Sequence, residues 1–246
     1  MEVHHKPKPW DGWREFLKEI GTIVIGVLIA LGAEQGVEWS HHREQAAEAR
    51  SAVRAEVAKN LTEIQVRLAT QTCVEKRLDE IGELLSRTQE GVLSQTPNWV
   101  GQPAIVYMAS QRWQAAAGSG RVSLFDVDEQ GRYATIYNQT AELAAQEGPE
   151  QVAWAQLRGL EDWRGPLGPA GRVSFLQALQ QARYSLWSTR VTLLLALKAG
   201  RSVGISPPAQ AKINALPHSV CLPISTPRAT ALAALTDTDA SFGQPK

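Results

Sequence analysis

Three side chains near the start of the chain have the types and spacing for ion chemistry. Glu34, Glu38 and His42 follow one another at intervals of four residues, which places them on one face of a helix. Two carboxylates and an imidazole on one face could bind a metal ion or relay a proton. The alternative is a solvated helix face just above the lipid headgroups. We favour this second interpretation and predict no metal site.

The distribution of histidine argues against one common class of catalysis. The five histidines lie at positions 4, 5, 41, 42 and 218, so the segment Glu44–Val203 contains none. Acid–base catalysis and activated nucleophiles most often depend on histidine. No pair of carboxylates stands out as a substitute. We therefore predict no catalytic residue, and we expect that the chain is not an enzyme.

Two short motifs resemble ligand loops, but each lacks a required residue. Asp126–Gly131 has the form of the opening of a calcium loop, yet the twelfth position is Tyr137 instead of a bidentate Glu. We interpret Asp126 as a helix N-cap, with Glu129 completing a capping box. Gly118-Ser119-Gly120 lacks the spacing of a phosphate loop. The sequence thus indicates no cofactor.

The element that dominates the sequence is an apolar helix flanked by tryptophans. Ile20–Ala33 carries no charge, Trp10 and Trp13 precede it, and Trp39 follows it. A spanning helix needs about 20 mostly apolar residues, so we extend the span to residues 16–39. From Trp13 to Trp39 a helix rises about 39 Å, which matches a bilayer with its headgroups, where tryptophan prefers to lie. We predict a membrane anchor with an aromatic belt at each end.

A cleaved signal peptide is the alternative to an anchor. Its cleavage site would be the small residues around Ala30-Leu31-Gly32-Ala33. However, the leader before the apolar run is long and includes acidic residues, and the helical pattern continues past Ala33. We therefore favour the anchor.

The charges on either side of the anchor favour one orientation. Basic residues near the span are slightly more numerous before it than after it, and such residues tend to stay in the cytoplasm. They are Lys6, Lys8, Arg14 and Lys18 before the span, and Arg43, Arg50 and Arg54 after it. The short N-terminus is therefore expected inside, and the large C-terminal part outside.

One side of the anchor carries small residues. Gly26, Ala30 and Ala33 lie along it, and Gly32-x-x-x-Gly36 lies at its outer end. Small faces let helices approach closely in lipid, so this helix-contact face could pair with a second copy or with another membrane protein. Small residues are also simply common in such helices.

Composition limits the other partners. The chain has 25 basic and 25 acidic residues and no strongly basic block, so nothing suggests a nucleic-acid groove. Its 43% hydrophobic content is enough for a packed core. Cys73 and Cys221 could pair if the domain lies in an oxidising compartment, and would then tie the C-terminal tail to the first helix. They could equally be two unrelated buried thiols.

For the rest of the chain, the sequence predicts helices joined by Gly- and Pro-rich loops. A stripe with steps of three and four residues predicts a stalk helix over 40–94, with a phase slip at Thr70–Cys73. We expect tryptophans 99, 113, 154, 163 and 187 to pack between helices. Further helices are predicted over 104–117, 126–147 and 150–163, with a break or kink at Gly148-Pro149, and over 172–200, buried on more than one side. Residues 121–125 are the one short strand candidate.

Beyond Ser202 the composition changes. Six of the thirteen prolines lie there, which predicts an extended or disordered tail with a brief helix near 209–214. The predicted fold is therefore all-α: a transmembrane helix continues into a long stalk helix, which packs in an antiparallel bundle of about four helices. The expected divisions are a short cytoplasmic N-terminus (1–15), the transmembrane helix (16–39), the bundle domain (40–203) and the tail (204–246).

Two stretches resemble a group of uncharacterised bacterial proteins. One is Glu19–Leu31, EIGTIVIGVLIAL; the other is Trp113-x-x-Ala116-x-Gly118-x-Gly120 with Asp126–Tyr137. Members of that group have one N-terminal membrane helix followed by an all-helical domain. The resemblance implies a bacterial inner-membrane protein with a periplasmic domain, and it supplies no catalytic residues.

Two functional hypotheses follow. The first is a non-catalytic interaction or scaffold protein of the cell envelope. Such a protein could be an accessory subunit of a larger membrane complex, with contacts through the stalk stripe and the small-residue face. The second is a periplasmic helical bundle that senses a ligand. Because few residues precede the span, a sensor of this kind would need a partner to transmit its signal.

Overall fold

The computed structural model describes residues 12–88, 91–93, 95–161, 163–207 and 219–242, with side chains as far as residue 235. In this part of the chain the regular structure is helical, which confirms the all-α class. The elements are α1 (Trp13–Ala69), α2 (Gln71–Ser86), α3 (Gln111–Gly118), the 3₁₀ helix η1 (Arg121–Leu124), α4 (Val127–Arg158), α5 (Pro169–Ser202), the 3₁₀ helix η3 (Ser219–Cys221) and α6 (Arg228–Phe242).

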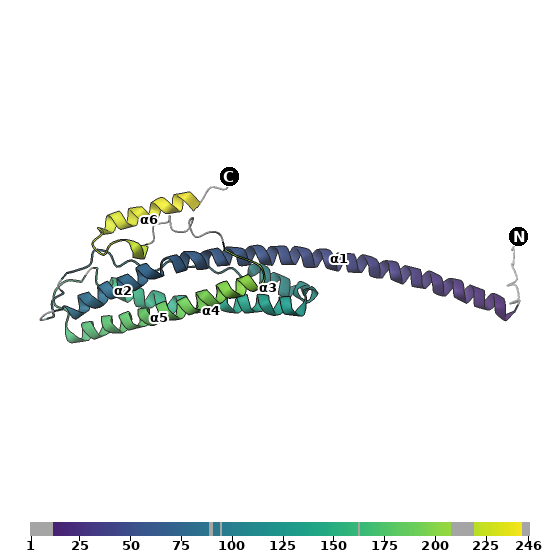
Figure 1. The fold of residues 1–246 in the computed structure, drawn as a ribbon, viewed down its shortest axis with the longest axis horizontal. Helices are drawn as coiled ribbons and strands as arrows, with labels where there is room; N and C mark the ends of the chain where they lie inside the picture. The colour runs from purple at the N-terminus through teal and green to yellow at the C-terminus, as the bar shows by residue number, and fades with distance from the viewer. Residues whose placement is uncertain (1–11, 89–90, 94, 162, 208–218, 243–246) are drawn as a thin grey trace, which may run out of the picture.

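Helix α1 has two halves with different environments (Figure 1). Its N-terminal half projects from the bundle as a single rod, and its apolar side chains are exposed; Ile29, for example, is 67% exposed. Its first buried residue is Ala46, and from there Val53, Val57 and Leu61 pack into the core. One 57-residue helix therefore joins the projecting segment rigidly to the bundle.

The predicted stalk helix is interrupted where the sequence slips in phase. α1 ends at Ala69, Thr70 caps it, and α2 begins at Gln71. The Thr70 hydroxyl donates to the Arg67 carbonyl at 2.8 Å, which occupies one of the last carbonyls of the helix. The structure therefore has two helices in place of one, and the second ends at Ser86, short of the predicted residue 94.

The bundle consists of α1 and α2 packed against the antiparallel pair α4 and α5 (Figure 1). Two clusters of buried side chains fill it. The proximal core, near the projecting half of α1, includes Val57, Leu61, Ile136 and Leu193. The distal core is built on α2, the end of α4 and the start of α5, with the fully buried Trp154 within it.

Helix α4 has no break at Gly148-Pro149, where the sequence predicts a break or a kink. It is continuous from Val127 to Arg158 with Pro149 inside it. Proline in a helix interior normally costs a hydrogen bond and a steric clash. Here the packing of α4 against α5 along both cores outweighs that local cost.

Three other local predictions are wrong. Residues 104–110 are not helical, and the helix starts only at Gln111. Residues 121–124 form a 3₁₀ helix instead of a strand. Helix α5 is buried on one side only, because its other face is exposed, including Trp187 at 62%.

The tail differs from the expected extended or disordered chain where it can be described. Cys221 lies in η3, and α6 forms over Arg228–Phe242 with Ala231 fully buried. The short helix predicted near 209–214 lies outside the described residues. The disulfide and the packing of η3 supply an attachment that proline content does not indicate.

Candidate functional site

The most elaborate polar structure in the bundle holds an extended segment that we call the strap, residues 98–110. A chain without helix or sheet must find other partners for its backbone groups. Buried side chains supply them here: Arg67 donates to the Ala104 carbonyl at 2.9 Å, and Glu147 accepts from the Val106 amide at 2.9 Å. The strap is therefore fastened to the helices by side chains.

Asn60 and Glu161 fasten the two ends of the strap. The fully buried amide of Asn60 bonds both backbone groups of Ala109, at 2.7 and 2.9 Å. The Glu161 carboxylate accepts from the Val100 amide at 2.7 Å. An Asn side chain used in this way satisfies a peptide group as a neighbouring strand would.

Where the strap enters α3, Glu56 of α1 accepts from the amides of Arg112 and Trp113, at 2.8 and 3.2 Å. These amides belong to the first turn of α3, which lacks partners of its own and favours a negative charge. Tyr137 donates to the same carboxylate at 2.6 Å, and burial together with the neighbouring Glu56 raises the pKa of the Tyr137 phenol. Tyr137 therefore acts as a neutral donor.

Under the middle of the strap lies an ion pair. Arg67 and Glu150 meet at 2.5 Å, with side chains only 1% and 10% exposed. Burial raises the pKa of Glu150, and the Arg67 charge opposes this only in part. Isolated buried charges are costly, so the pair is stable because each member has its partner.

A small cavity of about 20 Å³ adjoins the ion pair. It is lined by Arg67 and Glu150, by Trp154 and Thr189, and by the strap. Among the described residues, the Trp154 indole nitrogen and the Thr189 hydroxyl have no hydrogen-bond partner. This volume has room for about one water molecule, far below the several hundred Å³ of an ordinary ligand pocket.

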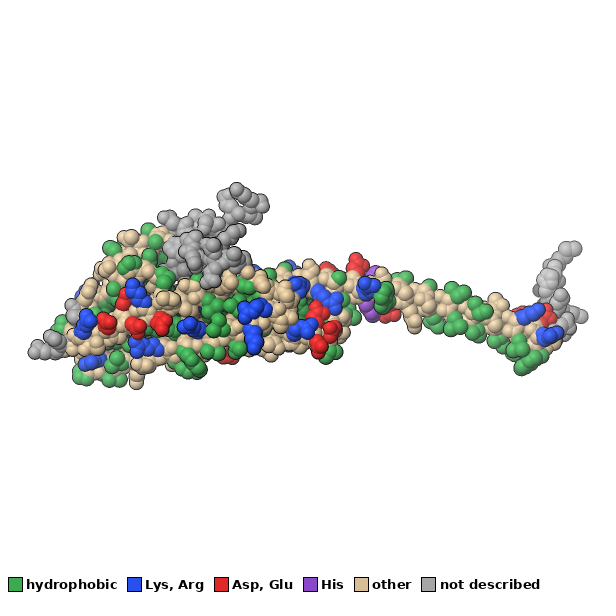
Figure 2. Space-filling view, viewed as in Figure 1, with side chains coloured by type: hydrophobic (Ala, Val, Ile, Leu, Met, Phe, Trp, Pro, Cys, Tyr) green, Lys and Arg blue, Asp and Glu red, His purple; other side chains and the backbone are tan. Residues whose placement is uncertain are grey.

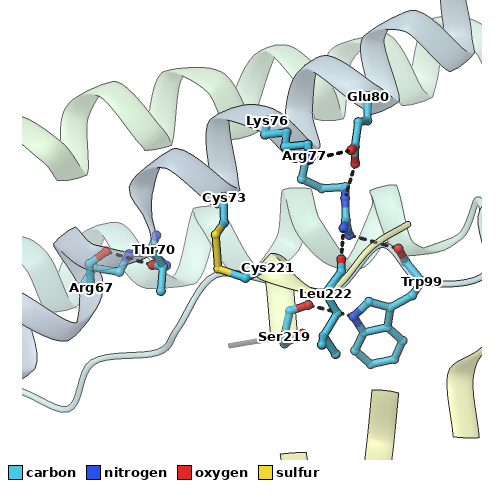
Figure 3. Close-up of a disulfide and its surroundings, with 10 residues drawn as sticks. All are labelled: Arg67, Thr70, Cys73, Lys76, Arg77, Glu80, Trp99, Ser219, Cys221 and Leu222. Atoms are coloured by element: carbon cyan, nitrogen blue, oxygen red, sulfur yellow. Dashed lines mark hydrogen bonds and ion pairs between the residues drawn. A yellow bond between two sulfur atoms is a disulfide. The ribbon is translucent and has the colours of Figure 1, made fainter. Parts of the chain in front are cut away.

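A second polar centre holds the tail (Figure 3). The disulfide between Cys73 of α2 and Cys221 of η3 joins positions 148 residues apart, with Cα atoms 4.9 Å from each other. One turn after Cys73, the buried Arg77 guanidinium donates to carbonyls of both the strap (Trp99, Val100) and the tail (Leu222). The Trp99 indole donates to the Ser219 carbonyl at 2.8 Å. We call this group the tail clamp.

The approach of strap and tail also explains Gly101. Its φ is +70°, and a Cβ at this position would lie 2.6 Å from the Ser219 carbonyl oxygen. Only glycine fits without displacing the tail.

The residues that the sequence singled out stay apart from this site. His42 and Glu38 approach to 4.0 Å on the exposed surface of α1, and no group of three or more potential metal ligands occurs among the described residues. Trp13 and Trp39 are 71% and 61% exposed, and the Arg43 guanidinium lies 4.6 Å from the Trp39 ring centroid. Trp10 lies outside the described residues.

The small-residue face of α1 has no neighbour among the described residues outside its own helix. A Cβ added at Gly26, Gly32 or Gly36 would meet no atom within 4 Å, and Ala30 and Ala33 are exposed. The stalk stripe behaves differently, since Val53, Val57, Leu61 and Ile64 are fully buried in the proximal core. The stripe is therefore unavailable for the contacts with a partner that the sequence suggested.

Sequence reasoning missed Glu56, Asn60 and Arg67, although a signal was present. They lie at steps of three and four from Val53, Val57 and Ile64, on the same buried stripe. Polar residues on a core face must be paired, so these positions pointed to a buried polar network.

The capping prediction is half confirmed. The Asp126 carboxylate accepts from the Asp128 amide at 2.9 Å, as an N-cap should. Glu129 does not complete the box, because it pairs with Arg50 of α1 at 2.8 Å.

Comparisons of the chain with protein-family models, with curated proteins and with solved structures found no match.

Proposed function

We propose that this chain is a non-catalytic, single-pass membrane protein of the bacterial cell envelope. Its anchor would hold the disulfide-bonded helical bundle at the membrane surface, where the bundle would bind a partner protein. The observation that carries the proposal is the continuity of α1. Its N-terminal half is long and apolar enough to cross a membrane, none of that apolar window is buried in the bundle, and its C-terminal half lies in the core.

The geometry of α1 would place the bundle close to the bilayer. Ala46, the first buried residue, lies seven positions after Trp39, which corresponds to about 10 Å of helix. The bundle would then lie just beyond the headgroups. A rigid connection of this kind fixes the position of a binding surface relative to the membrane.

The disulfide supports a location outside the cytoplasm, since such bonds persist in oxidising compartments. The slight excess of basic residues before the anchor favours the same direction, with a cytoplasmic N-terminus and a periplasmic bundle. The bacterial inner membrane rests on the resemblance of Glu19–Leu31 to bacterial single-span proteins.

Attachment and orientation can be tested together in a bacterial host. Membranes carrying the full chain are washed with alkaline carbonate, and spheroplasts are treated with protease. The proposal predicts that the chain stays in the membrane pellet and that the bundle is digested only after the outer membrane is opened. Release by carbonate would contradict the anchor, and protection of the bundle in spheroplasts would contradict the orientation.

Ligand sensing is the second candidate, and the cavity under the strap is the observation that favours it. Its lining includes the charged side chains of Arg67 and Glu150 and two groups without partners among the described residues, but its volume of about 20 Å³ suits nothing larger than a water molecule. A sensor would require the strap to move. Strap amides that exchange slowly with deuterium would exclude this candidate; rapid exchange at Val106 and Ala109 would favour it.

A further inference from the structure

Helix α5 has a second apolar face that the bundle leaves uncovered. Its buried side, which includes Phe175, Leu179 and Leu193, packs into the two cores. The opposite side is exposed along most of the helix. Its large members are Val173 (53% exposed), Tyr184 (61%), Trp187 (62%), Val191 (42%), Leu194 (51%) and Leu195 (46%).

The spacing on this side is that of a helix–helix seam. Alternating steps of four and three residues run along α5 through exposed positions, as the a and d positions of a heptad do. They are Val173, Gln177, Gln180, Tyr184, Trp187, Val191, Leu194 and Lys198. We call this set the α5 seam. A shallow hollow lies near its N-terminal end, between Val173 and Gln181.

The charged side chains of α5 itself are all basic. Helix α5 has no acidic residue in its 34 positions. Four arginines, 172, 183, 190 and 201, are 11, 7 and 11 positions apart, and both intervals return to nearly the same side of a helix. We call them the arginine row. Arg183 pairs with Asp79 of α2, while Arg172, Arg190 and Arg201 make no ion pair with the part of the chain that the structure describes.

Aromatic residues beside arginine are the composition of energetic centres in protein interfaces. The Tyr184 and Trp187 rings lie 5.9 Å apart and form a broad exposed surface at the middle of the seam. In Figure 2, hydrophobic side chains lie at the lower left edge of the bundle, where α5 runs in Figure 1.

Three other occupants fit this face less well. A second α5 would offer no partner for the arginine row, because the helix has no acidic residue among its 34 positions. A lipid surface would need the face to point at the bilayer, but α5 runs alongside α1, so the face points sideways from the anchor (Figure 1). The chain's own α6 lies on the far side of α1 and α2 from α5 (Figure 1).

We infer that the α5 seam is the docking surface for an amphipathic helix of a different protein, with apolar residues in heptad spacing and a row of Asp or Glu facing the arginine row. This inference rests on the proposed function and names its partner's chemistry. Because the face is lateral to the anchor, the partner helix would lie beside the bundle, roughly along the direction of α1.

The test uses the full chain in nanodiscs of neutral phospholipid, with empty nanodiscs as the blank. The probe is a fluorescent peptide of about four heptads with Leu at a and d and Glu at e and g. The matched probe carries Lys in place of Glu. Fluorescence anisotropy should show binding of the acidic probe and at least about tenfold weaker binding of the basic one, with affinity falling as salt rises.

Variants locate the binding. Trp187→Ala and Arg190→Glu should each weaken the acidic probe about tenfold or more. Both side chains are exposed, so circular dichroism of the variants should match the parent. Lys59→Glu reverses an exposed charge on α1 and should leave the affinity unchanged.

Equal binding of the two probes, absence of binding, or loss of binding in Lys59→Glu alone would overturn the inference. So would self-association of the parent chain that Trp187→Ala abolishes, because the occupant would then be a second copy. None of these results bears on whether the chain stays in the membrane after carbonate treatment, so the two proposals can fail separately.

Discussion

At the scale of single residues, the bundle depends on polar side chains at core positions. Asn60, Arg67 and Glu56 lie on the buried stripe of α1 and bind backbone groups of the strap and of α3. Leaving any of those backbone groups unpaired inside the bundle would cost about 1–3 kcal/mol. These residues therefore determine the path of the strap, which a purely apolar stripe could not do.

The pKa of Glu150 gives a testable consequence at this scale. Its folded-state pKa lies above its ordinary value of 4.5 because burial outweighs the charge of Arg67. Between the unfolded and folded pKa values the folded chain binds the extra proton, so this residue's contribution to stability falls as pH rises through that window.

Glu150→Gln removes the titration. The free energy of unfolding of the parent minus that of Glu150→Gln should decrease as pH rises from about 4 upward, and should level off above the folded pKa. Urea unfolding at a series of pH values measures this difference. Glu63→Gln, on the part-exposed surface of α1, is the control and should give a nearly flat difference. A Glu150→Gln difference that grows with pH would mean that Arg67 lowers the pKa more than burial raises it.

At the scale of elements, close contacts between helices and the tail clamp hold the bundle together. Gly200 of α5 lies against α1, and a Cβ there would overlap the Leu61 Cδ1 atom. Leu61 is fully buried and has little room to move. The absence of a side chain at Gly200 thus allows α5 to pack closely against α1 at Leu61.

Gly200→Ala should therefore destabilise the chain by about 1–3 kcal/mol through overpacking, despite the better helix propensity of alanine. In Gly131→Ala, on the exposed surface of α4, a Cβ would meet no atom of another element within 4 Å, so the same change should stabilise α4 by about 0.5–1 kcal/mol. Thermal unfolding followed by circular dichroism would show shifts of opposite sign. Shifts of the same sign would contradict the close packing of α1 and α5.

The disulfide makes a further prediction for the tail. Replacing both cysteines, Cys73→Ser with Cys221→Ser, removes a link across 148 residues and should cost about 2–5 kcal/mol. The Arg77 bonds to strap and tail remain, so the bundle should still fold while the tail becomes sensitive to protease. Limited proteolysis of the parent with and without reductant is the measurement. Identical digestion patterns in both conditions would show that the disulfide does not hold the tail.

The sequence predicted the elements well where the periodic pattern was long. α1, α4 and α5 follow from steps of three and four residues, and the phase slip at Thr70 marks a real interruption. Pro149 misled the prediction because packing between α4 and α5 overrides a local breaker. Residues 104–110 misled it because buried side chains on distant helices bind their backbone in an extended form.

The exposed side of α5 could not be predicted for a related reason. Apolar residues such as Trp187 and Leu194 look like core in a sequence, and only the position of the neighbouring helices shows which side is covered. The same holds for Arg67 and Glu150, which are 83 residues apart and become partners only when α1 and α4 pack together.

At the scale of the whole molecule, one rod and one bundle share a single helix. The projecting half of α1 exposes apolar residues along its length (Figure 2), whereas the bundle contains two cores of buried apolar side chains. In water such an exposed apolar rod would be costly, and in a bilayer it is the favoured arrangement. The proposed location of this half in lipid would account for its exposed apolar surface.

The depth of Ile25 in the bilayer tests this account most directly. The chain's cysteines are joined to each other, so a nitroxide can be attached selectively at Ile25→Cys, near the middle of the apolar run, and in a second variant at Glu48→Cys on the exposed surface beside the bundle. In vesicles, the label at position 25 should be relaxed strongly by oxygen and weakly by a water-soluble nickel complex, and the label at position 48 should show the reverse. Strong relaxation of the label at position 25 by the nickel complex, or a mature chain from which that position has been cleaved, would contradict the account.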